Sequence, residues 1–284
     1  MQKIRLAAFS DEADSSILGQ IQALKRNGLN LTELRTVEGK NVSILTEEES
    51  KEYKKIFDDN GVNVWSIGSP LGKVDINVDF KAYSETIKKV CNTANVFDTK
   101  RIRMFSFFNA YENRNKVIDY LSQMVEIANE YGVYMCHENE KEIYGDNLER
   151  VQDIMNSVKG LKFVYDPANY LQVGEMADNT LDALHDKTDY FHIKDVISQT
   201  GELVPAGYGD GKIEKLIEMI NSDKVLTLEP HLAVFAAFKD IDNTQMKHKF
   251  KFFSSADAFD CAIKSLKDLL IKAGYQEKDG AFIK

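Results

Sequence analysis

The chain has 284 residues, with 36 Lys and Arg against 45 Asp and Glu, and this gives a formal net charge of −9 and a pI near 5.2. An acidic balance of this size argues against a surface that holds the phosphates of a nucleic acid. The three Cys form no CxxC pair, which argues against a disulfide framework, and no leader-like segment or run of 18 apolar residues is found. We therefore expect a cytoplasmic protein that binds neither nucleic acid nor a membrane.

Short apolar runs rich in β-branched or aromatic residues alternate with longer stretches of helical period. The predicted strands are, in chain order, Ile4–Ser10, Leu29–Arg35, Val62–Gly68, Arg101–Phe107, Val133–Glu138, Leu161–Asp166, Tyr190–Lys194 and Val225–Glu229. The predicted helices between and after them are Asp14–Asn27, Glu47–Asn60, Phe80–Asn95, Glu112–Tyr131, Asn147–Val158, Gln172–Leu184, Ile213–Ile220 and Ala256–Ala273. Gly28, Gly61 and Gly132 each follow a predicted helix directly, as glycines at helix ends do.

Eight strand–helix units in strict alternation predict parallel strands joined by right-handed crossovers. Length alone would also allow two domains of average size. No linker rich in Pro, Gly or Ser and no break in composition divides the chain, however. We therefore predict an α/β protein whose residues 1–284 form one (β/α)8 TIM barrel.

The longest irregular segment is Pro230–Ser255, between the last strand and the last helix. It carries five phenylalanines among charged residues, namely Phe235, Phe238, Phe250, Phe252 and Phe253. A segment this long inside a compact domain usually has a function. Two functions remain open for it, a lid over a site or a contact between the subunits of a homo-oligomer.

Chemistry-bearing residues end the last four predicted strands. Barrel enzymes place their catalytic groups at the carboxyl ends of the strands. Glu138, Asp166, His192 and Glu229 occupy such ends and are separated by 28, 26 and 37 residues, close to one unit each. We expect these four side chains to meet at one rim of the barrel.

Three carboxylates and one imidazole form a mostly hard, oxygen-rich ligand set. Such a set suits one divalent ion, with Mn²⁺ or Mg²⁺ favoured and Zn²⁺ or Co²⁺ also accepted. Without a cation the three converging carboxylates would repel one another, and some would take up protons. Separate solvated charges or helix caps are the alternative for each residue taken alone, but matching positions in four successive units favour a metal site.

Two further residues near these strand ends have open roles. Glu140 shares the strand parity of Glu138 and would replace it as the ligand if the strand ran two residues further. His231 follows Pro230 in the long segment. We expect His231 to be an exposed loop residue, with substrate contact as the alternative.

The first half of the chain offers charged and aromatic candidates. Glu33 is expected to form a structural pair with an arginine, and Arg103 is one candidate for that partner. Arg103 could instead meet a phosphate or acid group of a substrate. Trp65 and the run Phe105–Phe108 could form an apolar wall against which a sugar stacks, with core packing as the alternative.

Five segments of the second half carry a resemblance to a known family. The runs HENEKEIYGDN, VYDPANYLQVGE, FHIKD, VPAGYGDGKI and LTLEPH resemble the xylose-isomerase-like TIM-barrel superfamily, and within it the sugar-phosphate isomerase/epimerase branch. This resemblance implies that the four rim residues hold one divalent cation and that Glu138 and Glu229 also move protons. It also places Asn169 and Lys194 beside the substrate, and Glu140 and His231 are kept as further candidates for substrate binding.

The chain departs from the family's pattern at two places. Tyr208 stands where the glycine-rich stretch often has Glu, and no clear arginine follows His192 where several sugar epimerases use one to hold substrate. Both departures concern the sugar and leave the metal site intact.

The residues fit proton transfer next to a carbonyl. A metal chelated by a carbonyl and a neighbouring hydroxyl stabilises the enediolate that forms when a carboxylate removes the α-proton. Returning a proton to the same carbon gives an epimer, returning it to the neighbouring carbon gives an isomer, and losing β-hydroxide gives a dehydratase. We therefore expect a metal-dependent sugar or sugar-phosphate isomerase or epimerase. The alternatives are a dehydratase acting on a cyclitol or keto-sugar, or an inactive carbohydrate-binding barrel. A multi-zinc endonuclease is disfavoured because the whole chain has only five His.

Overall fold

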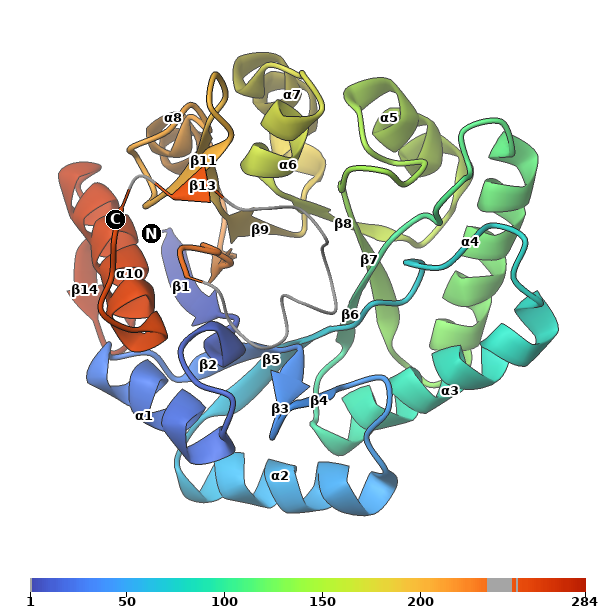
Figure 1. The fold of residues 1–284 in the computed structure, drawn as a ribbon, viewed down its shortest axis with the longest axis horizontal. Helices are drawn as coiled ribbons and strands as arrows, with labels where there is room; N and C mark the ends of the chain where they lie inside the picture. Colours follow the sequence, from blue (N-terminus) through green and yellow to red (C-terminus); the bar gives the residue numbers. More distant parts are fainter. Residues whose placement is uncertain (1, 234–246, 249) are drawn as a thin grey trace.

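The computed structural model describes residues 2–233, 247–248 and 250–284. Eight parallel strands form a closed barrel in the order β12, β9, β8, β7, β6, β5, β2 and β1, with β12 pairing back to β1 (Figure 1). These strands are β1 (Lys3–Ala8), β2 (Leu31–Leu34), β5 (Asn63–Gly68), β6 (Arg101–Met104), β7 (Tyr134–Glu138), β8 (Lys162–Tyr165), β9 (Tyr190–Ile193) and β12 (Lys224–Leu228). The predicted (β/α)8 barrel is confirmed.

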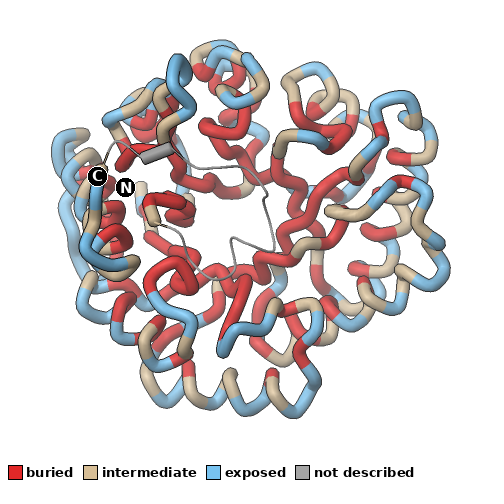
Figure 2. The backbone as a smooth tube through the Cα atoms, in the orientation of Figure 1, coloured by how far each residue is buried: buried red, intermediate tan, exposed pale blue. Residues whose placement is uncertain are grey.

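Helices surround the barrel, and Figure 2 shows that their buried residues face inward while their outer faces are exposed. They are α1 (Ile17–Arg26), α2 (Glu47–Asp59), α3 (Phe80–Val96), α4 (Arg114–Glu130), α5 (Leu148–Ser157), α6 (Pro167–Gln172), α7 (Ala177–Leu184), α8 (Ile213–Met219) and α10 (Ser255–Lys272). The helix predicted over Gln172–Leu184 is wrong in its bounds, because α6 ends at Gln172 and Gly174 has a φ of +86° before α7 begins.

The predicted fourth strand is also too long. The strand β6 ends at Met104, and the backbone N–H groups of Phe105 and Phe107 donate to Leu71 and Gly72, in the loop after β5. A φ of +70° at Phe107 marks where the chain turns away from the barrel. The segment after β6 therefore forms part of the rim, fastened to the loop after β5.

The inside of the barrel is filled by a small apolar cluster, separate from the larger core between strands and helices. Its buried members are Ala7, Leu31, Cys136, Val164, Tyr190 and Val225. Side chains two residues apart on a strand point to the same face. Glu138, Asp166 and His192 each follow a member of this cluster by two residues, so the barrel carries them inward, one layer above an apolar floor.

Seven short strands and two 3₁₀ turns, none of them predicted from the sequence, complete the described fold. They are β3 (Thr36–Val37), β4 (Lys40–Asn41), β10 (Asp195–Ile197), β11 (Glu202–Val204), β13 (Lys247–His248), β14 (Gln276–Lys278) and β15 (Ala281–Ile283), together with the 3₁₀ turns η1 (Ser10–Glu12) and η2 (His185–Lys187). The hairpin of β14 and β15 pairs antiparallel with the beginning of β1, which pairs with β2 only between Ala8 and Thr32. The hairpin thus covers β1 at the amino-terminal face of the barrel.

Much of the long segment predicted over Pro230–Ser255 lies outside the described residues, namely 234–246 and 249. Its role as a lid or a subunit contact stays a prediction. None of the helices within the described ranges is long and apolar enough to cross a membrane.

The loop after β5 offers a test of how the rim is built. Gly72 has a φ of +85°, and a Cβ added there would lie 2.0 Å from the carbonyl oxygen of Phe105. We expect Gly72→Ala to lower the free energy of unfolding by about 3 kcal/mol or more, since backbone strain and a backbone clash combine. Urea denaturation followed by circular dichroism measures the loss.

Gly39→Ala is the matched control, because Gly39 has a φ of +72° with nothing within 4 Å of an added Cβ. Gly39→Ala should lower the free energy of unfolding by only about 1–2 kcal/mol, which is the cost of a left-handed backbone conformation at a residue with a Cβ. Equal losses for the two variants would contradict the close approach of the two rim segments.

Candidate metal centre

Four polar side chains meet at the carboxyl ends of β7, β8, β9 and β12. Glu138 is the last residue of β7, Asp166 follows β8, His192 lies in β9 and Glu229 follows β12. One ligand atom from each lies within 4.8 Å of the others, and all four residues are buried. The structure thus brings together the four residues that the strand ends suggested. We call them the rim cluster.

The donor set of the rim cluster fits a divalent cation. Asp166 Oδ1 accepts a hydrogen bond of 3.0 Å from the backbone N–H of Asn169, at the start of α6. Asp166 Oδ2 is buried and has no hydrogen-bond partner in the described part of the chain, although Lys194 Nζ lies 2.9 Å away. An oxygen-seeking cation bound among these ligands would satisfy this atom.

Burial, and to a lesser extent the neighbouring carboxylates, shifts the ionisation of Asp166. Burial raises the pKa of Asp166 to about 7; Lys194 opposes the shift, and the carboxylates of Glu138 and Glu229 add to it. Removing a carboxylate from water disfavours its charged form, and like charges nearby do the same. A divalent cation bound among these ligands would favour the ionised form of Asp166.

Glu33 orients the imidazole of His192. Its Oε2 lies 3.1 Å from His192 Nε2, while its Oε1 accepts a hydrogen bond of 2.7 Å from the hydroxyl of Tyr190. His192 Nδ1 lies 2.9 Å from Glu138 Oε1. Burial by itself would lower the pKa of His192, but the carboxylates of Glu138 and Glu33 raise it well above its usual value. With a proton on Nε2 shared with Glu33, Nδ1 can serve as a metal ligand.

The expected direct pairing of Glu33 with an arginine is not found, but Arg103 acts on Glu33 at longer range. Burial would raise the pKa of Glu33, whereas His192 and Arg103 lower it. Within the described residues, no arginine lies within ion-pair distance of Glu33, and the partners of its carboxylate are His192, Tyr190 and Ser66. Glu33 lies on β2 and His192 on β9, which are not neighbours in the barrel. The contact crosses the barrel interior, and spacing along the chain does not reveal such contacts.

Asn169 and Lys194 lie directly beside the rim cluster. The side-chain amide of Asn169 donates to the backbone oxygen of Asn139 at 2.9 Å and lies 3.5 Å from Glu138 Oε1. Lys194 Nζ lies 3.6 Å from Glu229 Oε2, in addition to its contact with Asp166. Burial would lower the pKa of Lys194, but the nearby carboxylates raise it, so its ammonium stays charged.

Glu140 is not a member of the rim cluster, so the alternative in which it replaces Glu138 is wrong. Its Oε2 instead forms an ion pair of 2.9 Å with Lys73. His231 is buried, and the expectation of an exposed loop histidine is wrong. Its Nε2 lies 3.5 Å from Glu229 Oε1, and burial, opposed by Glu229, lowers its pKa to about 4. His231 is therefore a neutral neighbour of the rim cluster at pH 7.

A buried arginine at the end of β2 was missed as a site residue. Arg35 Nε and Nη2 donate to the two carboxylate oxygens of Asp11 at 2.9 Å, and Nη1 donates to Glu229 Oε1 at 3.0 Å. Asp11 and Glu12 lie in the turn η1, directly after β1. Burial, opposed by Arg35, raises the pKa of Glu12 to about 8. The signal was present, since acidic residues follow the first strand and Arg35 follows the second.

A small cavity of about 150 Å³ lies beside the rim cluster. Its lining residues are Arg35, Asn41, Gly68, Pro70, Lys73, Arg103, Phe105 and Phe108. Arg103 Nε lies 3.4 Å from Glu138 Oε2, which connects this rim cavity to the cluster. Phe105 and Phe108 therefore line the site region, as the apolar-wall hypothesis suggested.

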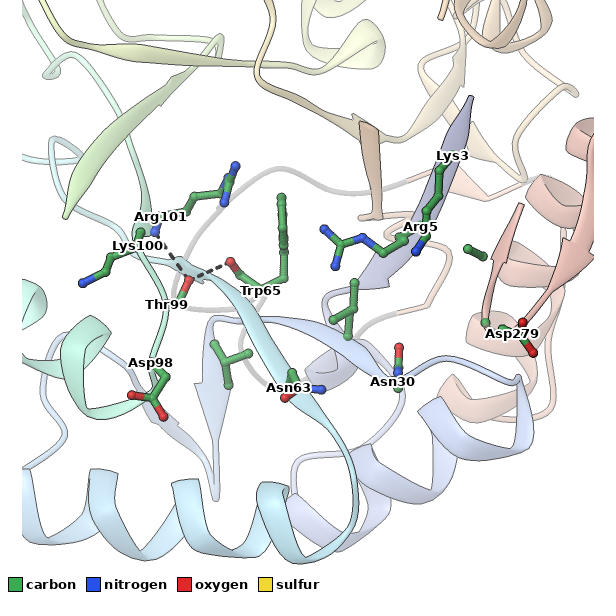
Figure 3. A pocket seen from close by; sticks show the side chains of 14 residues that line it. Lys3, Arg5, Asn30, Asn63, Trp65, Asp98, Thr99, Lys100, Arg101 and Asp279 are labelled. Atoms are coloured by element: carbon green, nitrogen blue, oxygen red, sulfur yellow. Dashed lines mark hydrogen bonds between the residues drawn. The ribbon is translucent and has the colours of Figure 1, made fainter. Parts of the chain in front are cut away.

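Trp65, the other residue of that hypothesis, lies at the opposite end of the barrel. It lines a cavity of about 420 Å³ at the amino ends of the strands, together with Lys3, Asn63 and Lys100 (Figure 3). The guanidinium carbon of Arg101 lies 3.9 Å from the centre of the Trp65 ring. Trp65 is therefore not part of the site.

The glycine-rich stretch around Tyr208 supports β10 instead of the rim cluster. The carboxylate of Asp195 accepts backbone hydrogen bonds of 2.9–3.0 Å from Gly207, Gly209 and Gly211. A Cβ at Gly209 would lie 2.3 Å from an Asp195 oxygen, so only glycine fits there. Tyr208 is exposed, and its ring packs 5.5 Å from that of Phe250.

Comparison with known proteins places the chain in a family. The model of the family described as xylose isomerase-like TIM barrel matches residues 21–255. The chain belongs to this family. No match was found among curated proteins.

Solved structures with the same fold include enzymes of different reaction types. The probable 3-DHS dehydratase AsbF from Bacillus anthracis is 17% identical, with 94% of this chain and 99% of that chain covered and a TM-score of 0.70. The IolI protein with a bound zinc atom is 16% identical, with 95% and 99% covered and a TM-score of 0.71. A D-allulose 3-epimerase from Methylomonas sp. is 14% identical, with 95% and 99% covered and a TM-score of 0.70. At these identities the likeness shows the fold alone.

The contact between Glu33 and His192 predicts an effect on metal affinity. We expect Glu33→Gln to weaken Mn²⁺ binding by about 10–100-fold, because the imidazole loses the carboxylate that fixes its tautomer and orientation. Isothermal titration with Mn²⁺ measures the dissociation constant. Glu126→Gln, at an exposed position of α4, is the control and should bind like the wild type. An unchanged affinity in Glu33→Gln would contradict this role.

Proposed function

We propose that this protein is a divalent-metal-dependent isomerase or epimerase. Its substrate would be a small carbohydrate, that is, a sugar, a polyol or a sugar phosphate. The observation that carries the proposal is the pair of buried carboxylates, Glu138 and Glu229, within one cluster of metal-capable side chains. His192 Nδ1 lies 2.9 Å from the first and 3.4 Å from the second. Two proton acceptors thus flank one small volume in which a substrate carbon could lie.

Glu138, Asp166, His192 and Glu229 would hold the cation. The hard oxygen donors favour Mn²⁺ or Mg²⁺, while Zn²⁺ or Co²⁺ would also fit this set. When bound, such a cation polarises a carbonyl and stabilises negative charge on its oxygen. The remaining chemistry falls to the side chains of the chain itself.

Glu229 is equipped to act as a base. Burial would raise its pKa, but Lys194, His192 and His231 hold that pKa well below its usual value. Arg35 adds a hydrogen bond to Oε1. Glu229 therefore stays ionised in a water-poor site and can accept a proton from a carbon next to a carbonyl.

Glu138 would act from another side of the same volume. The strands β7 and β12 are separated in the barrel by β8 and β9, so the two carboxylates reach inward from different directions. Arg103 lies 3.4 Å from Glu138 Oε2 and compensates its charge. Acceptors on two sides of one carbon support epimerisation, while two acceptors near adjacent carbons would give an isomerisation.

Asn169, Lys194, Glu140 and His231 are the residues that we propose bind the substrate. Asn169 and Lys194 carry donors next to the rim cluster, and neutral His231 lies beside Glu229. Hydroxyl groups of a carbohydrate both donate and accept hydrogen bonds, so donors and acceptors in one site suit them.

Replacing either base tests the proposal. In the Mn²⁺-loaded protein we expect Glu138→Gln and Glu229→Gln each to lower the rate of solvent deuterium exchange into a ketose by about 10²–10⁴-fold, since an amide keeps the shape but accepts no proton. Both variants should also bind less metal. Mass spectrometry of the sugar measures the exchange across a panel of ketoses and aldoses.

Glu126→Gln again serves as the control with unchanged exchange. Turnover like that of the wild type in Glu229→Gln would sink the mechanism with two carboxylates. A product lighter by one water would instead assign the protein as a dehydratase.

A further inference from the structure

The cavity beside the rim cluster is positively charged on its walls. Three of its lining residues, Arg35, Lys73 and Arg103, are cations, and no carboxylate lines it in the part of the chain that the structure describes. Its volume of about 150 Å³ is well below the roughly 300–1,000 Å³ of sites that enclose a whole drug-sized ligand. The cavity therefore suits one small group at the end of a substrate.

Arg103 has unused hydrogen-bonding capacity. It is buried, and no hydrogen bond joins its guanidinium to any other described residue. Its Nε is an orphaned buried donor, 3.4 Å from Glu138 Oε2 without the geometry of a hydrogen bond. A buried donor left unpaired is costly, and arginine is suited to bidentate pairing with carboxylate or phosphate.

Lys73 lies at the same cavity because backbone hydrogen bonds join its loop, after β5, to the segment after β6. The backbone N–H of Phe105 donates to the oxygen of Leu71 at 2.8 Å, and that of Phe107 donates to Gly72 at 2.9 Å. The ammonium of Lys73 then lies 4.4 Å from the centre of the Phe105 ring and, among the described residues, forms one ion pair, with Glu140. An ammonium carries three donors, so Lys73 keeps capacity for a ligand.

Arg35 contributes positive charge to the cavity but few hydrogen-bond donors that a ligand could use. Its guanidinium is already held by Asp11 and Glu229, as described above. The positive field of the cavity therefore comes from all three cations, while the hydrogen bonds to a ligand would come from Lys73 and Arg103.

We propose that the substrate of this site carries an anionic group, a carboxylate or a phosphate, which Lys73 and Arg103 bind in the rim cavity while the carbonyl end lies at the rim cluster. The proposal rests on the proposed function and narrows its substrate class. A neutral sugar offers Lys73 and Arg103 only uncharged hydroxyl acceptors, whereas an oxyanion offers charged acceptors that pair with both cations.

Three ketoses that differ only at one end test this proposal. D-fructose is neutral, D-fructuronate carries a carboxylate at C6, and D-fructose 6-phosphate carries a phosphate there. With Mn²⁺-loaded wild type, we expect at least one charged ketose to bind at least tenfold more tightly than D-fructose by isothermal titration. The tighter of the two identifies the anion, and the preference should weaken at high salt.

Variants connect that preference to the cavity. Lys73→Met and Arg103→Met should each lower the affinity for the charged ketose at least tenfold more than they lower the affinity for D-fructose, because only the charged ketose loses an ion pair. Lys100→Met, at the opposite end of the barrel, is the matched control and should keep the preference. Inorganic phosphate and acetate, followed by thermal shift, probe the cavity directly, and their stabilisation should disappear in the Lys73→Met, Arg103→Met double variant.

Deuterium exchange on the same three ketoses separates the two proposals. Preferential binding of a charged ketose without exchange supports the anion site and contradicts the proposed function. Exchange into D-fructose as readily as into both charged ketoses supports the proposed function and overturns the anion site. Binding of neither the charged ketoses nor the simple anions, or binding that the double variant retains, also overturns it.

Discussion

Burying three carboxylates in one barrel mouth is the constraint on which the rest of the site depends. A carboxylate removed from water must find opposite charge or give up its own. In this chain Glu138, Asp166 and Glu229 stand among cations drawn from several strands, and Asp166 still has its pKa raised to about 7 by burial and by its neighbours. The need to balance charge, more than apolar packing, therefore explains which side chains line the inside of this rim.

The balancing groups also tie distant strands together. Arg35 from the end of β2 reaches Glu229 after β12, and Glu33 on β2 reaches His192 on β9. These contacts cross the barrel interior, so they hold the rim in one geometry independently of the hydrogen bonds between neighbouring strands. A site preorganised in this way loses little entropy when a substrate binds.

The sequence predicts the barrel and the rim cluster well, because both follow from periodicities. Alternating units define the strands, and the polar residue at each strand end is carried to the same edge. The partners of those residues were not predictable in the same way. The contact of Glu33 with His192 and the burial of His231 depend on which strands face each other and on how a loop folds back. Propensity likewise suggested that the strand from Arg101 continues to Phe107, whereas tertiary pairing with the loop after β5 ends it at Met104.

The pairing of β1 has a consequence for biosynthesis. Its residue Leu6 pairs with Leu226 of β12, and its residue Arg5 pairs with Ala281 of β15. A ribosome that adds about 5–20 residues per second leaves this strand without those partners for roughly 10–55 seconds. An unpaired strand edge is a template for aggregation, and charged residues are the usual protection. Lys3 and Arg5, which interrupt the apolar run of β1, would keep the nascent chain soluble until closure.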